Sequence, residues 1–430
     1  MYKIKVGFRI NLICIGLCFF AFPVLAQNRV FKLEECYQLA EENYPLIKKQ
    51  DLIEATRDYS ISNVSKLYLP QVNIMGQASY QSETISFPDA LSAMPGVNIP
   101  ELSKDQYKVQ GEVNQLVFDG GKLRNQKGLA RVNAETQRQQ LNVDLYALRS
   151  RINQLYFSVL LMKEQLKQNE LRKEDLQLAV DKMVAALENG VAYRSNVDEL
   201  KAELSVVESA TIEFTGNMNS YLQMLSLFTG VSFTETDQLI MPAESEISFE
   251  INRPELMLFA SRKKSYDIQE KQLHSDYLPK INAFFQGAYG RPTLNIIEDR
   301  ADFWYIGGLR LNWAFGSLYT LSNNKKILNL NRQSLEAEKE TFLFNTNLEL
   351  KQQEAQLLKY KKLIIEDEKA ISFRASVKES SKAQLDNGVI TVRDFIAQVN
   401  AENLARQTQI LHRIHLLQTI YNLKYTSGKK

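Results

Sequence analysis

The feature that most limits what this chain can fold into is an internal repeat with a period of about two hundred residues. Tyr68-Leu-Pro-Gln-Val-Asn recurs as Tyr277-Leu-Pro-Lys-Ile-Asn. Two more segments recur in the same order: Leu116-Val-Phe-Asp-Gly-Gly as Trp313-Ala-Phe-Gly-Ser-Leu, and Leu187-Glu-Asn-Gly-Val as Leu385-Asp-Asn-Gly-Val. This period is far longer than that of solenoid repeats, so the sequence predicts one duplicated unit.

Each copy is predicted to contain a helix, a β-hairpin, a very long helix, a turn and a shorter helix. The first repeat covers residues 27–232, with strands at about 70–81 and 106–118 and long helices at about 121–189 and 194–230. The second covers residues 254–430, with strands at about 279–290 and 302–315 and long helices at about 317–387 and 391–426. Residues 233–253, which contain Pro242, break the helical pattern and link the repeats.

Residues 1–26 are predicted to be a secretory signal peptide. Lys3, Lys5 and Arg9 precede an apolar stretch that ends in Val24-Leu25-Ala26, where a signal peptidase would cut. Cleavage leaves Cys36 as the single cysteine, so neither an intrachain disulfide nor a lipid anchor is expected. No later stretch approaches the roughly 18 apolar residues of a membrane helix, so any membrane span would consist of strands.

The strand segments alternate between an apolar, aromatic-rich face and a mostly polar one. Phe303, Tyr305 and Leu309 share one face of the last strand, whereas Arg310 and Asn312 point the other way. Strands of about ten residues suit a membrane barrel, although such alternation is also typical of a soluble sheet. Four strands cannot close a barrel alone; two chains would supply eight and three would supply twelve, and a conducting lumen favours the trimer.

The long helices carry heptad repeats of apolar residues, which predict left-handed coiled-coil neighbours. If unbroken, a helical run of about seventy residues would be about 100 Å long, several times the thickness of a bilayer. The heptad positions are Leu141, Leu145, Leu148, Ile152, Leu155, Val159, Met162 and Leu166, then Leu200, Leu204, Val207, Thr211, Phe214, Met218, Tyr221, Leu225 and Phe228, and finally Leu350, Leu357, Ile364 and Ile371.

Together these signals resemble the TolC-like outer-membrane efflux protein family over nearly the whole mature chain. The resemblance is carried by the duplicated turns Asn189-Gly190-Val191 and Asn387-Gly388-Val389, by Pro70 and Pro279 before the odd strands, and by Phe118-Asp119-Gly120-Gly121. It implies a mainly α protein with a membrane β-barrel portion, in which a homotrimer forms a 12-stranded β-barrel in the outer membrane of a Gram-negative bacterium and a 12-helix tunnel in the periplasm.

The resemblance also implies a function and partners. The chain would be a passive duct of a tripartite efflux or type I secretion system, gated at its periplasmic helical tip. Its partners would be outer-membrane lipid, a periplasmic adaptor (membrane fusion protein) and an inner-membrane RND or ABC transporter. Adaptor docking is implied for Asn189, Gly190, Val191, Arg194, Ser195, Asn196 and Val197 at the first turn, and for Asn387, Gly388, Val389, Thr391 and Arg393 at the second.

Asp394 takes the position of an acidic gate ring in the family, while Ala397 stands where a second acid is found. Simpler structural roles remain open for the residues of both turns. The glycines suit helix ends, and both Ser195 with Asp198 and Thr391 with Asp394 have the capping-box arrangement. For Arg194 and Arg393, a solvated surface is the favoured alternative to pairing with an adaptor.

Enzyme chemistry, cofactors, metal and nucleic-acid binding are not expected. There is no nucleotide loop, nucleophile motif or pair of acids, and His412 and His415 lack a third ligand. The net charge is only +2, with basic residues interleaved among acidic ones. Two other functions stay open: a periplasmic coiled-coil scaffold, which would share the heptads, and a general diffusion porin, which would share the barrel.

Overall fold

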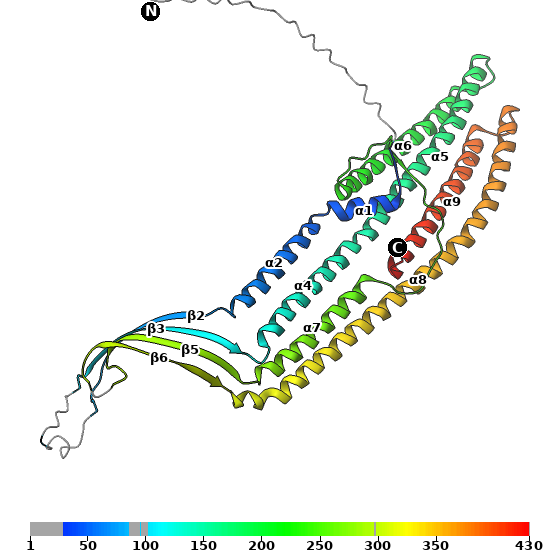
Figure 1. Cartoon of the computed structure of the whole chain (residues 1–430). Coiled ribbons are helices and arrows are strands. Elements are labelled where there is room, and N and C mark those ends of the chain that lie inside the picture. Colours follow the sequence, from blue (N-terminus) through cyan, green and yellow to red (C-terminus); the bar gives the residue numbers. More distant parts are fainter. Residues whose placement is uncertain (1–28, 86–94, 96–101, 296–297, 430) are drawn as a thin grey trace, which may run out of the picture.

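The computed structural model describes residues 29–85, 95, 102–295 and 298–429. The predicted signal peptide and most of the first hairpin loop lie outside these residues. The chain is elongated, with one sheet at one end and two helix–turn–helix tips at the other (Figure 1). Long helices join the two ends, so the protein is mainly helical.

The sheet contains four antiparallel strands in the order β2 (Gln71–Tyr80), β3 (Asp105–Phe118), β5 (Lys280–Arg291) and β6 (Asp302–Asn312). The pairing of β3 with β5 joins strands from the two predicted repeats, with Glu112 opposite Gln286. Within the described residues, β2 and β6 each have one strand neighbour only. The sheet of a single chain is therefore open at both edges.

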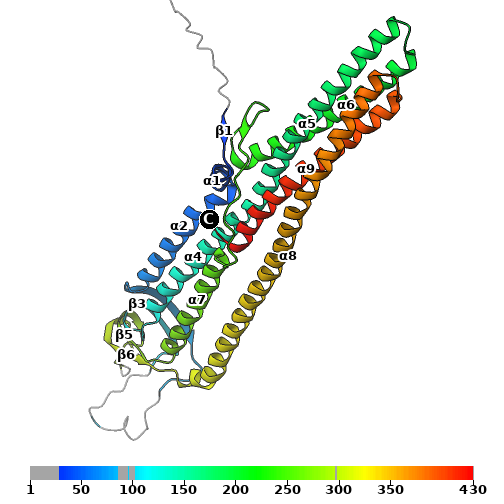
Figure 2. The ribbon, with the colours of Figure 1, turned by 90° about the vertical axis from the view of Figure 1, so that its right-hand side faces the viewer.

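Four helices continue from the sheet and lie side by side (Figure 2). They are α2 (Lys49–Lys66), α4 (Lys122–Tyr146), α7 (Pro254–Asp276) and the first part of α8 (Leu318–Asp386), which follows the short η2 (Phe315–Ser317). Each packs on the next in the order α2, α4, α7, α8. This order continues the strand order of the sheet.

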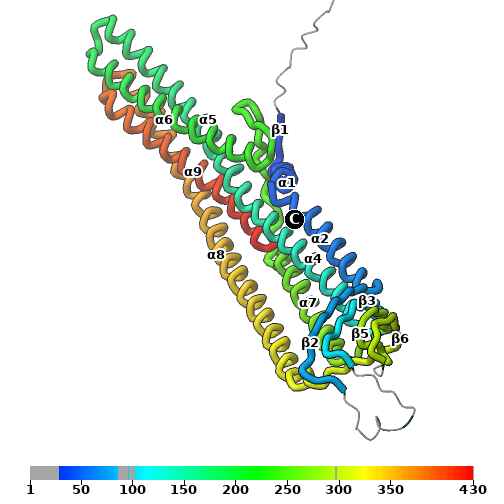
Figure 3. Tube along the Cα trace, turned by 90° about the vertical axis from the view of Figure 1, so that its left-hand side faces the viewer, coloured from blue at the N-terminus to red at the C-terminus, as the bar shows by residue number. Residues whose placement is uncertain are grey.

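The far half is built from two helical hairpins. The helices α5 (Leu148–Glu188) and α6 (Arg194–Thr229) form one, and α8 with α9 (Val392–Ser427) forms the other. They pack together mainly through α5 and α9. Around the middle, α1 (Leu33–Asn43), η1 (Pro45–Lys48) and the two-residue pair β1 (Val30–Phe31) and β4 (Gln238–Leu239) lie against the long helices (Figure 3).

The heptad residues form the predicted seams. Leu141, Ile152, Val159, Leu200 and Leu225 are among the heptad positions that are almost fully buried. The prediction of one continuous helix over 121–189 is wrong, because the helix is interrupted at Ala147. The interruption lies where the neighbours change: α4 packs between α2 and α7, whereas α5 packs on α1, α6 and α9.

The buried apolar side chains of the far half form two separate clusters. One, around Ile152, Tyr156 and Leu225, lies at the middle of the molecule, where α1 covers the helices. The other, around Leu176, Leu200 and Phe395, lies close to the tips. Between them, α5, α6, α8 and α9 are joined by polar contacts.

Candidate functional site: the helical tip

The two tips share one backbone geometry. Gly190 and Gly388 have φ of 74° and 68°, which glycine adopts without steric cost. The N–H groups of Val191 and Val389 reach back to the carbonyls of Ala186 and Gln384, and so satisfy carbonyls that the ending helices leave free.

The predicted docking asparagines take part in these turns. The side-chain amides of Asn189 and Asn387 donate to Ala185 O and Ala383 O at 2.8 and 2.7 Å. Each side chain therefore closes its own helix end. The apolar side chains beside them, Val191 and Val389, are 80% and 71% exposed, which leaves an apolar surface at the end of each hairpin.

The capping box predicted at the second tip is confirmed. The Thr391 hydroxyl accepts from Asp394 N at 3.2 Å, and Asp394 Oδ2 accepts from the backbone N and hydroxyl of Thr391 at 3.1 and 2.6 Å. These hydrogen bonds, first of all that of the Thr391 side chain, hold the pKa of Asp394 below its usual range. Asp394 is exposed and therefore stays ionised, whether or not it also forms a gate ring.

The capping box predicted at the first tip is wrong. The helix α6 begins at Arg194 with Tyr193 at the N-cap position, and no side chain caps it. Ser195 lies inside the first turn, where its hydroxyl is 3.4 Å from Asn196 Oδ1. The prediction missed this because a three-residue spacing does not say where the first helical residue falls.

The remaining tip residues are either exposed at the surface or buried beneath the turn. Arg194 is exposed, with Nε 3.8 Å from Asp198 Oδ2, and Arg393 is also exposed. Val197 is only 4% exposed, so in this chain it supports the turn and offers little surface to a partner. Tyr193, which no sequence pattern singled out, is 79% exposed.

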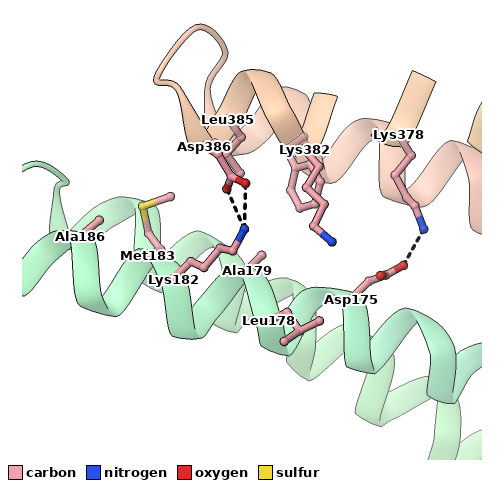
Figure 4. A pocket seen from close by; sticks show the side chains of 11 residues that line it. Asp175, Leu178, Ala179, Lys182, Met183, Ala186, Lys378, Lys382, Leu385 and Asp386 are labelled. Atoms are coloured by element: carbon pink, nitrogen blue, oxygen red, sulfur yellow. Dashed lines mark hydrogen bonds and ion pairs between the residues drawn. The ribbon is translucent and has the colours of Figure 1, made fainter. Parts of the chain in front are cut away.

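A groove lies just behind the tips, between α5 and α8 (Figure 4). It encloses about 330 Å³ and has an apolar lining with charged groups around it. Lys182 Nζ and Asp386 Oδ2 form an ion pair across it at 2.8 Å, and both are exposed. The lining residues are Asp175, Leu178, Ala179, Lys182, Met183 and Ala186 from α5, Lys378, Lys382, Leu385 and Asp386 from α8, and Phe395 from α9.

A partly buried ionic cluster closes the inner end of the groove. Lys378 Nζ lies 2.7 Å from Asp175 Oδ2 and 2.8 Å from Glu402 Oε2, and Arg406 also binds Glu402. Burial by itself would lower the pKa of Lys378, but its hydrogen bonds to both carboxylates outweigh this and raise it. Burial likewise opposes ionisation of Glu402, yet Lys378 and Arg406 keep the pKa of its carboxyl below the usual range. The cluster is therefore ionised and joins α5, α8 and α9.

A second polar cluster lies beside the first. Arg172 binds both Glu203 and Asn400 Oδ1, the latter at 2.6 Å, and Asn400 donates to Glu203 Oε1 at 3.0 Å. This cluster joins α5, α6 and α9. Together the two clusters connect all four helices between the apolar cores.

Sequence reasoning missed the groove and both clusters, although it found the turns. The ion pairs join residues such as Lys182 and Asp386 that are 204 positions apart. No periodicity connects such residues. The available signal was a charged residue, Glu402, three positions after the buried Val399 of α9.

At the opposite end, the sheet has its apolar face outside. Ile74, Phe303, Tyr305 and Leu309 are each more than 70% exposed. In β3 the polar residues Gln106, Lys108 and Gln110 are more covered than Tyr107 and Val109 between them. This is the reverse of the pattern of a sheet that packs on a soluble core.

Among the described residues, no helix is both long and apolar enough to cross a membrane.

The two histidines considered as metal ligands face Tyr360. The rings of His412 and His415 lie 5.9 and 5.6 Å from the Tyr360 ring. His412 Nδ1 is 2.6 Å from Asp367 Oδ2, and His415 Nδ1 is 3.3 Å from Gln418 Oε1. They form part of the contact between α8 and α9.

The fold is that of the outer-membrane efflux channels. The chain resembles the outer-membrane channel OprN, with a TM-score of 0.67 and 13% identity over 93% of this chain and 90% of that one. It resembles CusC, whose structures concern folding and transmembrane channel formation, with a TM-score of 0.68 and 14% identity over 93% and 92%. It also resembles VceC of Vibrio cholerae, with a TM-score of 0.66 and 11% identity over 92% and 96%.

The sequence supports the same conclusion. Residues 36–231 match the sequence model of the family described as outer membrane efflux protein. The resemblance predicted from the repeats and turns is thereby confirmed. No curated protein matches the sequence significantly.

Proposed function

We propose that this chain is one subunit of a trimeric, passive export duct in the outer membrane, which receives its cargo from an inner-membrane transporter through a periplasmic adaptor. The observation that carries the proposal is the exposed apolar face of the sheet, at the end of the molecule opposite the helical tips. Such a face is stable in lipid and unfavourable in water.

The open edges of the sheet support a shared barrel. Unpaired backbone groups of β2 and β6 cannot remain exposed in lipid, so each edge needs a strand from another copy. Three copies would bring twelve strands together, which closes a barrel with a conducting lumen. The four helices that continue from each sheet would then line one tunnel.

The contacts behind the tips support gating. Opening would require α8 and α9 to separate from α5 and α6, and this breaks the pair of Lys182 with Asp386 and the contact of Lys378 with Asp175. The first pair is exposed and worth only about 0.2–1 kcal/mol per chain. This pair alone resists opening little, whereas the Lys378 contact and the apolar cluster near the tips also hold the helices together, so the duct would be closed at rest until a partner docks.

The groove supports docking at the same place. Its apolar lining, open between two helices, suits the apolar stripe of a helix from an adaptor. Val191, Val389 and Tyr193 extend this apolar surface to the tips. We assign the docking surface to these residues and the groove, with Val197 as internal support.

The proposal is tested by the mass and conductance of the detergent-extracted protein. Light scattering corrected for detergent should give a trimer, and planar bilayers should show rare, small openings. Lys182→Ala with Asp386→Ala should raise the open probability several-fold, while the matched control Arg194→Ala should not, because its partner Asp198 lies on the same helix.

The rival functions predict different results. A water-soluble monomer or dimer would show that the chain is a scaffold. Steady full conductance in the unaltered protein would show a diffusion porin. Photocrosslinking from Leu178 in the groove should capture an adaptor in cells, whereas Val206 on α6, which is equally exposed, should not.

A further inference from the structure

Most of the charged side chains of the sheet lie on one face. Pairing places Glu112 opposite Gln286 and Lys108 opposite Gly290, so these residues share a face of the sheet. Arg310 lies opposite Asn282, and Lys280 lies opposite Asn312, on the same face. On the apolar face of the four described strands, the only charged residues are Asp105 and Arg291, which pair with each other at the loop end of the sheet.

The middle of the polar face holds a cluster that is largely neutral. Glu112 Oε2 accepts from Gln286 Nε2 at 2.7 Å, and its Oε1 lies 3.5 Å from Arg310 Nη1. The Arg310 guanidinium reaches across β5, 4.6 Å from the centre of the Phe284 ring. Glu112 is therefore satisfied, and it partly offsets the charge of Arg310.

The positive charges of the two lysines on either side of this cluster are not offset by an acid. Lys108 lies toward the loop end of β3 and Lys280 begins β5 at the helical end. In the described parts of the chain, neither ammonium group has a hydrogen bond or ion pair. The one further acid on this face, Asp302, is at the loop end and pairs with Arg300 at 3.3 Å.

We propose that the polar face forms an anion-favouring section of the duct, with Lys108 and Lys280 as its unpaired charges and Arg310, shielded by Glu112, between them. The inference rests on the proposed duct, in which this face lines the lumen. Lysines held in a narrow passage with low-dielectric walls attract anions and repel cations. Anionic solutes would thus pass this section more readily than cations, in contrast to the acid-bearing tip at Asp394.

The test is the ratio of chloride to potassium permeability, taken from reversal potentials of single channels in a KCl gradient. All variants carry Asp394→Asn, so that the acidic side chain at the tip does not mask the ion selectivity of the sheet. Lys108→Glu with Lys280→Glu should lower the ratio by about two-fold or more. Lys32→Glu with Lys48→Glu makes the same total charge change at two exposed residues outside the four helices assigned to the tunnel. It should leave the ratio unchanged and serves as the control.

Cysteine variants give a second test, which distinguishes a loss of charge from misfolding. Lys108→Cys and Lys280→Cys should lower the ratio, a cationic methanethiosulfonate reagent should restore it, and an anionic one should lower it further. The neighbouring Val109→Cys, on the other face, should not respond. Cys36 does not interfere, because burial raises the pKa of its thiol to about 12.

An unchanged ratio in the lysine variants, or an equal response at Val109→Cys, would overturn the anion-favouring section while leaving the duct intact. Absence of unitary currents in every variant, including the parent, would instead overturn the proposed duct and the inference with it.

Discussion

The helical end and the sheet end of this molecule differ in which side chains they bury. In the helical end, Leu176, Leu200 and Phe395 are buried and the outer surface is charged. In the sheet, Ile74, Phe303 and Leu309 are exposed, while polar residues such as Lys108 and Gln110 are half-buried. The two ends are joined by long helices, so one chain presents a charged surface at one end and an apolar surface at the other.

This contrast shows that amphipathicity alone does not say which face is inside. A helix pair needs only one apolar seam, which its partner covers, and water takes the rest. The sheet has an uncovered apolar face, and in β3 the polar residues are the more covered ones. An uncovered apolar face is stable only where its surroundings are apolar. Pairs of matched substitutions, one at a buried or capped position and one at an exposed position, can therefore test each end separately.

Leu200→Ala should cost about 2–5 kcal/mol of unfolding free energy, because it opens a cavity in the tip core. Leu404 on α9 is 65% exposed and gives a control of identical chemistry, for which a loss below about 0.5 kcal/mol is expected. Urea unfolding followed by circular dichroism measures both. An equal loss at Leu404 would show that another chain covers that surface.

Ile74→Arg should cost about 2–4 kcal/mol in lipid vesicles, because a charge would face hydrocarbon. Asn73→Arg, one position along the same strand and on the polar face, should cost much less. The fraction folded in vesicles, measured by protease resistance over a urea series, separates the two. Equal effects would contradict the assignment of the apolar face to lipid.

Glu402→Gln should cost about 1–3 kcal/mol, because Lys378 loses the buried one of its two carboxylate partners. The pKa of Glu402 is lowered, so its contribution is present above the ordinary value of 4.5 and is lost as pH falls through the lowered pKa. The pKa of Lys378 is raised, so its contribution is present below 10.5 and is lost as pH rises through the raised pKa.

The difference between the parent and Glu402→Gln should accordingly be constant near neutral pH and should shrink in acid. Urea midpoints measured from pH 7 down to pH 3 would show this. A difference that grew in acid would mean that Glu402 is not held ionised by Lys378 and Arg406.

Thr391→Ala should cost about 1 kcal/mol, because it removes the N-cap of α9. Ser195→Ala, at the corresponding turn of α6, should change stability by a few tenths of a kcal/mol at most, since Ser195 caps nothing. The pKa of Asp394 should also rise toward its ordinary value in Thr391→Ala, which a carboxyl NMR titration can follow. Equal losses at the two sites would mean that Ser195 caps α6 in solution.

Much of the architecture was readable from local patterns. The period-two alternation located the strands, and the heptads located residues such as Ile152 and Leu200 that prove to be buried. The turns at Gly190 and Gly388 were found because glycine at a helix end has a specific backbone meaning. The interruption at Ala147 was not found, since the heptad continues across it without a break.

Most helices, strands and turns, and which residues share a face, follow from the amino-acid sequence alone, because they depend on the spacing of residues close together in the chain. Which residues some two hundred positions apart meet depends instead on tertiary packing. Lys182 with Asp386, Lys378 with Asp175, and Glu112 with Arg310 are joined by helix packing or strand order. An ion pair depends on distance in space, and no local pattern encodes that distance for residues on different helices or strands.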